Sequence, residues 1–124
     1  KGDTLGNTPW ALTFTPEYHF SVLGGKDAYV RAQDQFHSHN AGAFPGNNPN
    51  SISYDPDIPL APATNLLNLR AGLIWSGFDT SIFVNNALNS QPPLRLAHPV
   101  VGDPLYNDIT FRPLTAGVTV TYRY

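Results

Sequence analysis

The chain has 124 residues, enough for one ordinary domain, and contains 12 Pro, 10 Gly and no Cys. Only 13% of its residues are charged and the net charge is −2, which leaves no basic stripe to neutralise a series of phosphates. Nucleic acid is therefore not an expected partner. The lack of Cys excludes a disulfide framework, a thiolate metal site and a cysteine nucleophile.

The sequence contains no candidate membrane helix. No stretch reaches the roughly 18–20 consecutive apolar residues that such a helix requires, and the N-terminus lacks the pattern of a signal peptide. A membrane-spanning strand needs only about 10 residues of alternating apolar and polar character. The chain has no Met and begins Lys1, Gly2, Asp3, from which we expect it to be processed or cut from something longer.

The first half of the chain alternates between apolar and polar residues. This period of two predicts a strand over residues 10–22, although Pro16 cannot donate a hydrogen bond within it. After a Gly-rich break at residues 24–26, the alternation continues to residue 37, with Asp34 as the exception on the apolar side. Residues 38–63 are dense in Asn, Pro, Gly and Ser, which predicts a long loop.

The second half repeats this layout. A strand is predicted from about residue 67 to 75, a tight turn at residues 76–78, a fourth strand over residues 79–86, a loop over residues 87–108 and a last strand over residues 109–124. The sequence thus predicts an all-β chain of about five antiparallel strands. Its connections run short, long, short, long, which is typical of outer-membrane barrels with short periplasmic turns and long extracellular loops.

The two sides of the predicted strands differ in chemistry. One side is almost entirely apolar, and aromatic residues gather near the strand ends, as in the girdles of a transmembrane β-barrel. An antiparallel sheet with one face on a soluble core gives the same alternation. In a barrel, the polar side lines the lumen, and the candidate lumen-facing residues there are Glu17, His19, Arg31, Arg70 and Arg123.

The last strand carries a pattern that resembles the C-terminal assembly signal of outer-membrane barrels. Its residues are Thr115, Gly117, Val120, Tyr122 and the terminal Tyr124. Together with residues 69–72, 83–89 and 111–117, this pattern resembles the C-terminal end of TonB-dependent outer-membrane receptors. The resemblance covers roughly residues 66–124, whereas the first half agrees in layout only.

This resemblance implies a barrel of about 22 strands around a plug domain in the bacterial outer membrane. Since five strands cannot close such a barrel, we expect residues 1–124 to be the C-terminal fragment of its barrel domain, without the plug. The resemblance implies active uptake of a scarce nutrient, such as a siderophore-iron complex, cobalamin or a glycan. The implied partners are outer-membrane lipid, the rest of the barrel and its plug, the barrel-assembly machinery and, through regions outside this chain, the TonB energy-coupling complex.

Several other polar residues are candidates for ligand contacts. In the predicted extracellular loops these are His39, Tyr54, His98 and Tyr106. His37 and His39 could share a metal, but no third ligand accompanies them, and turn chemistry explains Asp55 and Asp57 better than a calcium site does. The sequence predicts no metal site and no cofactor.

Two other classes of function compete with the receptor hypothesis. A soluble all-β module could bind carbohydrate through exposed Trp and Tyr side chains. An enzyme has the least support, because Glu17, Thr15 and His19 lie on one predicted face without a nucleophile-elbow pattern around them. We therefore expect no catalytic residues.

Overall fold

The computed structural model describes residues 8–22, 24–42, 45–57, 60–97, 100, 103–105 and 107–124. Within these residues the regular structure is entirely β, which confirms the predicted all-β class. None of them belongs to a helix long and apolar enough to cross a membrane. The strands are β1 (Ala11–Phe14), β2 (Glu17–Val22), β3 (Lys26–His37), β4 (Thr64–Trp75), β5 (Phe78–Asn85), β6 (Arg95–Ala97), β7 (Asn107–Ile109) and β8 (Thr115–Tyr122).

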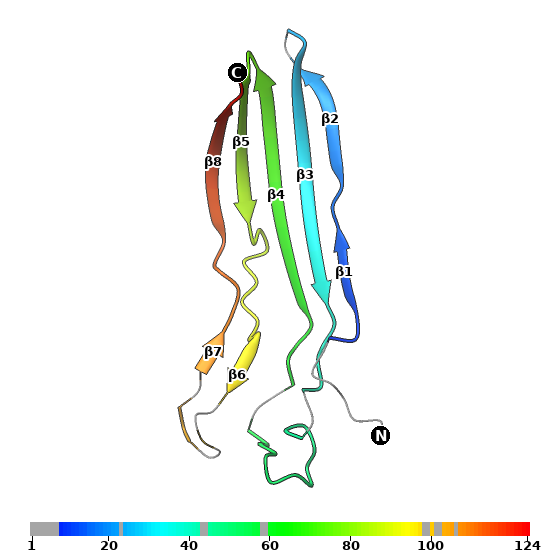
Figure 1. Cartoon of the computed structure of the whole chain (residues 1–124), viewed down its shortest axis with the longest axis vertical. Coiled ribbons are helices and arrows are strands. Elements are labelled where there is room, and N and C mark those ends of the chain that lie inside the picture. The colour runs from blue at the N-terminus through cyan, green and yellow to red at the C-terminus, as the bar shows by residue number, and fades with distance from the viewer. Residues whose placement is uncertain are drawn as a thin grey trace. The chain divides into compact units, whose positions relative to one another are not determined.

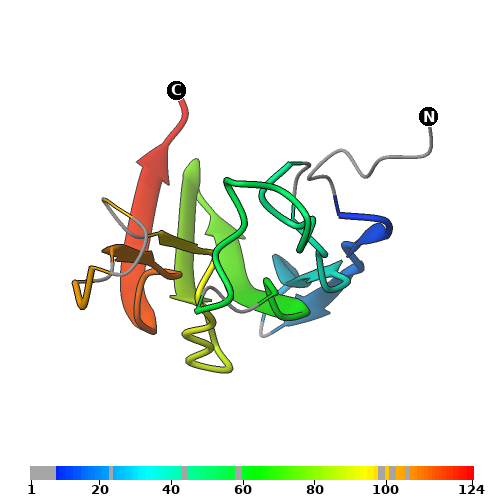
Figure 2. The same ribbon diagram turned by 90° about the horizontal axis from the view of Figure 1, so that it is seen from below.

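The strands form two sheets (Figure 1). The larger sheet has the order β1-β3-β4-β5-β8, with β2 also paired to β3, and its printed pairs are antiparallel. The view from below shows β1 and β2 at one edge of this open sheet and β8 at the other (Figure 2). The smaller sheet is the antiparallel pair β6-β7.

The chain divides into two compact units. One comprises residues 12–35, 65–90 and 112–124 and contains most of the larger sheet. The other contains residues 36–64 and 91–111 with the β6-β7 pair, together with the N-terminal residues up to 11. The first unit thus corresponds to the predicted strands, and the second to the predicted long loops.

Two tight turns connect the long strands of the sheet. Gly24 and Gly25 have φ values of 79° and 75°, and Ser76 and Gly77 have φ values of 44° and 78°. Positive φ at both central residues matches the twist of a β-hairpin, and glycine adopts it without steric cost. The β4–β5 turn is held further by the carbonyl of Gly77, which accepts a 2.8 Å hydrogen bond from the N–H of Arg123.

The first predicted strand is divided at Thr15 and Pro16 into β1 and β2. Pro16 has no N–H to donate, but its carbonyl accepts a 3.1 Å hydrogen bond from the N–H of Ala32 in β3. Because the acceptor is still used, β1 and β2 both pair with β3 across this interruption.

Two predictions for the second half were wrong in detail. The loop predicted over residues 87–108 contains β6 and the start of β7. The last strand does not run unbroken from residue 109, because residues 110–114 separate β7 from β8. Pro113 lies in this interval and cannot donate to a ladder, which explains why the pairing resumes only at Thr115.

Candidate functional site

The strand register assigns the side chains of the larger sheet to two faces. Glu17 lies opposite Arg31 in the β2–β3 pair. Arg70 lies opposite Phe83, and Phe83 lies opposite Gly117. The side chains of directly opposite residues on paired strands point to the same side of a sheet. Along each strand, every second side chain points to that side. The ring of Tyr29 in β3 lies against Gly72 in β4, which connects the sides of these two strands. One side, the polar face, therefore carries the polar residues Glu17, His19, Tyr29, Arg31, Gln33, Asn68, Arg70, Asp79, Ser81, Thr119 and Thr121.

The opposite side, the apolar face, is largely open, although Ala28 on it is buried. Val118 and Ile82 there are 66% and 60% exposed. On the polar face, Ser81 and Tyr29 are buried, whereas Glu17, His19 and Arg31 are exposed. A soluble sheet with one packed face has its apolar side chains covered. Among the described residues, no other element covers the apolar face of the sheet. The members of the apolar face include Tyr18, Val30, Leu69, Ile82, Val118 and Val120.

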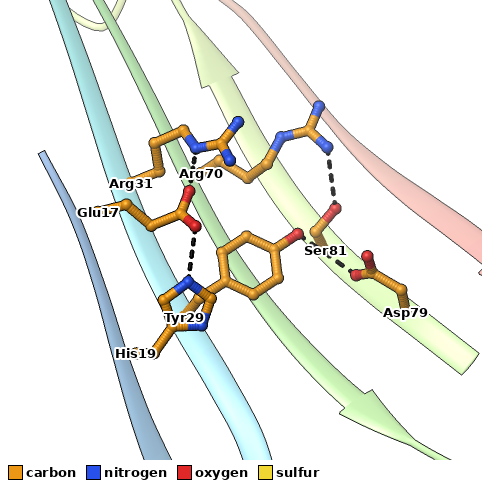
Figure 3. Close-up of polar contacts among 7 residues, drawn as sticks. All are labelled: Glu17, His19, Tyr29, Arg31, Arg70, Asp79 and Ser81. Carbon is orange, nitrogen blue, oxygen red and sulfur yellow. Dashed lines mark hydrogen bonds and ion pairs between the residues drawn. The ribbon is translucent and has the colours of Figure 1, made fainter. Parts of the chain in front are cut away.

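Three predicted lumen residues form an ion-pair cluster on the polar face (Figure 3). Arg31 donates a hydrogen bond from Nε to Oε2 of Glu17, while Oε1 of Glu17 lies 2.6 Å from Nε2 of His19. All three side chains keep part of their surface exposed. A charged cluster of this kind requires hydration, so it suits a water-filled space and not a packed apolar core.

Tyr29 is the most buried aromatic residue that the structure describes, at 8% exposure. Its ring occupies the space that a Cβ atom on Gly72 would take. Its hydroxyl donates a 3.3 Å hydrogen bond to Oδ1 of Asp79 in β5 (Figure 3). Tyr29 thus reaches from β3 over β4 to β5, and glycine at position 72 makes this crossing sterically feasible.

Arg70, the fourth predicted lumen residue, is also on the polar face. One of its terminal nitrogens lies 3.4 Å from Oγ of Ser81 (Figure 3). Its guanidinium group lies 5.7 Å from the centre of the Phe83 ring. Arg123, the fifth, follows the end of β8 and is exposed, and the structure does not place it with the cluster.

Aromatic rings gather near the β4–β5 turn of the sheet. The ring centres of Trp75 and Phe78 are 5.3 Å apart, those of Phe78 and Tyr122 are 4.8 Å apart, and those of Tyr122 and Tyr124 are 6.4 Å apart. Nζ of Lys26 lies 5.5 Å from the centre of the Trp75 ring. A row of rings with an adjacent cation suits the boundary between an apolar phase and water.

The residues of the predicted assembly signal lie at the free edge of the sheet. Thr115, Gly117, Val120 and Tyr122 belong to β8, and Tyr124 follows it. A Cβ atom on Gly117 would come within 2.6 Å of Cζ of Phe83, so the ring of Phe83 requires glycine there. β8 pairs only with β5 among the described strands, which leaves its other edge open.

Sequence reasoning assigned no role to Asn86, yet it is 2% exposed and links three segments. Its Nδ2 donates to the carbonyls of Ser90 at 2.9 Å and Arg112 at 2.8 Å, and its Oδ1 accepts from the N–H of Ser90 at 2.9 Å. Asn86 has a φ of 50°, a conformation that asparagine adopts more readily than most residues. The asparagines at the end of β5 and after it are the sequence feature that could have indicated this role of Asn86.

The same run joins β4, β5 and the approach to β8. The N–H of Asn86 donates a 3.0 Å hydrogen bond to Oδ1 of Asn68, and the N–H of Leu114 donates a 3.1 Å hydrogen bond to Oδ1 of Asn89. Asn89 also has a positive φ, of 48°. These contacts hold the segment that leads into β8 against the end of β5.

Two of the four predicted loop residues are described. His39 is exposed just after β3. Tyr54 is half-buried and lines a cavity of about 590 Å³ within the loop unit, together with Asn47, Asp55, Leu94 and others. His98 and Tyr106 lie outside the described residues.

No group of three or more metal-binding side chains occurs in the described part of the chain. Oδ1 of Asp55 accepts a 3.1 Å hydrogen bond from the N–H of Asp57, which is the local turn chemistry expected for this pair. Comparisons of the chain with protein-family models, curated proteins and solved structures find no match. The function is therefore argued from the chain's own residues.

Proposed function

We propose that this chain forms part of the wall of a transmembrane β-barrel in a bacterial outer membrane. The observation that carries the proposal is the open apolar face of the sheet, on which Tyr18, Ile82 and Val118 are 67%, 60% and 66% exposed. In a membrane barrel, lipid covers the apolar face and water fills the polar side. The aromatic row that includes Trp75 and Tyr122 supplies the interfacial girdle.

Within this class we propose a TonB-dependent receptor for active uptake of a scarce nutrient. The support is the pattern of Thr115, Gly117, Val120, Tyr122 and Tyr124 at the free sheet edge, preceded by the asparagine run after β5. In such a receptor, the sheet would continue into further strands of the barrel, and a plug domain would occupy the polar side. The loop unit with Tyr54 would belong to the extracellular entrance, where substrate contacts lie.

Paired cysteine variants in β8 test the membrane assignment. The natural chain has no cysteine, so each variant introduces a single thiol. Val118→Cys lies on the apolar face and Thr119→Cys on the polar face of the same strand. In membranes, we expect a lipid-soluble maleimide to label position 118 and a membrane-impermeant maleimide to label position 119 after the barrel is opened to water.

The two alternatives give opposite results. If the chain is a soluble all-β module that binds carbohydrate, it is recovered in the aqueous fraction and the impermeant reagent labels Val118→Cys readily, because that side chain is 66% exposed. That outcome rejects the barrel. Val120→Cys and Thr121→Cys provide a second pair with the same alternation and check that one substitution has not distorted the strand.

A further inference from the structure

The polar face contains two arginines from neighbouring strands. β3 and β4 are adjacent and run in opposite directions (Figure 1). The ring of Tyr29 in β3 lies over Gly72 in β4. Two residues further along β3 and two residues back along β4 are Arg31 and Arg70, so the antiparallel pairing puts them at neighbouring positions on the polar face, and Figure 3 draws both.

The positive charge of this pair is only half compensated. Like charges on directly opposite residues destabilise a sheet. Arg31 has Glu17 as its ion-pair partner, whereas Arg70 has no carboxylate partner within the described residues and contacts Ser81 and the ring of Phe83. The neutral hydroxyl and the ring leave a net positive charge on the three charged groups.

Glu17 bonds to Nε of Arg31 and leaves the terminal nitrogens of Arg31 available to bind another acceptor. Glu17 comes from β2 and accepts a hydrogen bond from Nε of Arg31, so it approaches on the side away from β4. Nε of Arg31 is used by Glu17 and one terminal nitrogen of Arg70 by Ser81, so the terminal nitrogens of Arg31 and the other terminal nitrogen of Arg70 remain as donors on this face. Planar guanidinium groups bind the oxygens of carboxylates and phosphates in pairs of hydrogen bonds.

We propose that Arg31 and Arg70 form one oxyanion-binding site that takes a carboxylate or phosphate group. The group comes from a small anion in the surrounding water or from an acidic side chain on a segment outside this chain. The site requires only the geometry of the sheet, so it does not rest on the membrane assignment. A failed cysteine-labelling test would leave the test of this site unaffected.

Arginine footprinting with phenylglyoxal tests the site on the full chain, with labelled positions mapped by peptide mass spectrometry. We expect inorganic phosphate to slow the labelling of Arg31 and Arg70 by about tenfold or more, the factor that one or two charge-assisted hydrogen bonds provide. Arg112 and Arg123 are exposed and serve as internal controls, whose labelling should not change. Equal labelling of Arg31 and Arg70 with and without phosphate, at the rate of Arg123, would overturn the proposal.

Labelling of the isolated chain and of a longer polypeptide that contains it distinguishes the two sources of the anion. If a polypeptide extended beyond residues 1–124 protects Arg70 without added phosphate, and the isolated chain does not, the acceptor is an acidic side chain of the same polypeptide. If protection requires phosphate in both, the site binds a free anion. Either result supports the site.

The variant Glu17→Gln tests whether phosphate protects Arg31 by binding to it. Glu17→Gln removes the competing carboxylate, so we expect phosphate to protect Arg31 at a concentration several-fold lower than in the parent chain. Asp27→Asn is the matched control, because Asp27 lies on the same face of β3 but is not bonded to Arg31. Equal phosphate dependence in the Glu17→Gln and Asp27→Asn variants would contradict a site at Arg31.

Discussion

Because the ring of Tyr29 lies against Gly72, we expect Gly72→Ala to destabilise the sheet when Tyr29 is present and not when it is replaced by alanine. In a strand, alanine in place of glycine is favourable by about 0.5–1 kcal/mol, because it reduces the freedom of the unfolded chain. At position 72, however, the new Cβ atom would coincide with the ring of Tyr29. Gly72 does not have a positive φ, so backbone strain does not contribute and the ring alone decides the outcome.

We expect Gly72→Ala to destabilise the sheet by about 1–3 kcal/mol, the usual cost of overpacking. In a Tyr29→Ala background the ring is gone, and the same substitution should become neutral or stabilising by up to about 1 kcal/mol. The two substitutions should therefore couple by roughly 1–4 kcal/mol in a double-mutant cycle. Urea unfolding in lipid vesicles or detergent, followed by tryptophan fluorescence, measures each corner of the cycle.

Two controls sharpen this cycle. Gly117→Ala would meet Phe83 and not Tyr29, so it should add to Tyr29→Ala without coupling. Tyr29→Phe keeps the ring but removes the 3.3 Å hydrogen bond to Asp79, and it should leave Gly72→Ala just as harmful. Free energies for Gly72→Ala and Tyr29→Ala that add to within about 0.5 kcal/mol would refute the steric argument.

Three further predictions concern other parts of the chain. Gly117→Asp or Tyr124→Ser should lower the amount of assembled barrel in the full-length protein, seen as a weaker heat-modifiable band on a gel; an unchanged band would contradict the assembly role. Asp34→Leu should stabilise the fold by about 1–3 kcal/mol, because Oδ1 of Asp34 is buried without a hydrogen-bond partner; an equal or lower urea midpoint would argue against this. Asn86→Ala should cost about 2–4 kcal/mol through three lost hydrogen bonds, whereas Asn86→Asp should cost more, because it puts a buried carboxylate oxygen against the carbonyls of Ser90 and Arg112; equal losses would exclude this order.

The alternation of residues was sufficient to predict the two faces of the long strands. It placed Ser81 and Phe83 opposite to Ile82, and the β5–β8 register confirms that division. Alternation could not predict the β6-β7 pair, because each strand has three residues and the pairing depends on backbone contacts such as the 2.7 Å hydrogen bond from Leu94 to Ile109. Strands this short carry too little pattern to distinguish them from loop.

The candidate site was predictable only where its residues are close in sequence or share an evident period. Glu17 and His19 are two residues apart on one strand, so their common side follows directly from the pleat. The contact of Tyr29 with Asp79 spans 50 residues and depends on the pairing of β3 with β4 across a long loop. No local pattern specifies that register, so the roles of Gly72 and the adjacency of Arg31 and Arg70 emerged only from the structure.

The distribution of buried side chains connects the fold to its surroundings. Among the described residues, the buried apolar side chains are those of Ala28 and Tyr29, and no large side chain is completely buried. Burial of apolar surface is the main favourable term in folding, at about 25 cal/mol per Å² removed from water. The larger sheet therefore requires an apolar partner for the side that carries Ile82 and Val118. In the proposed barrel, lipid would be that partner, and water would hydrate the Glu17 cluster on the opposite face.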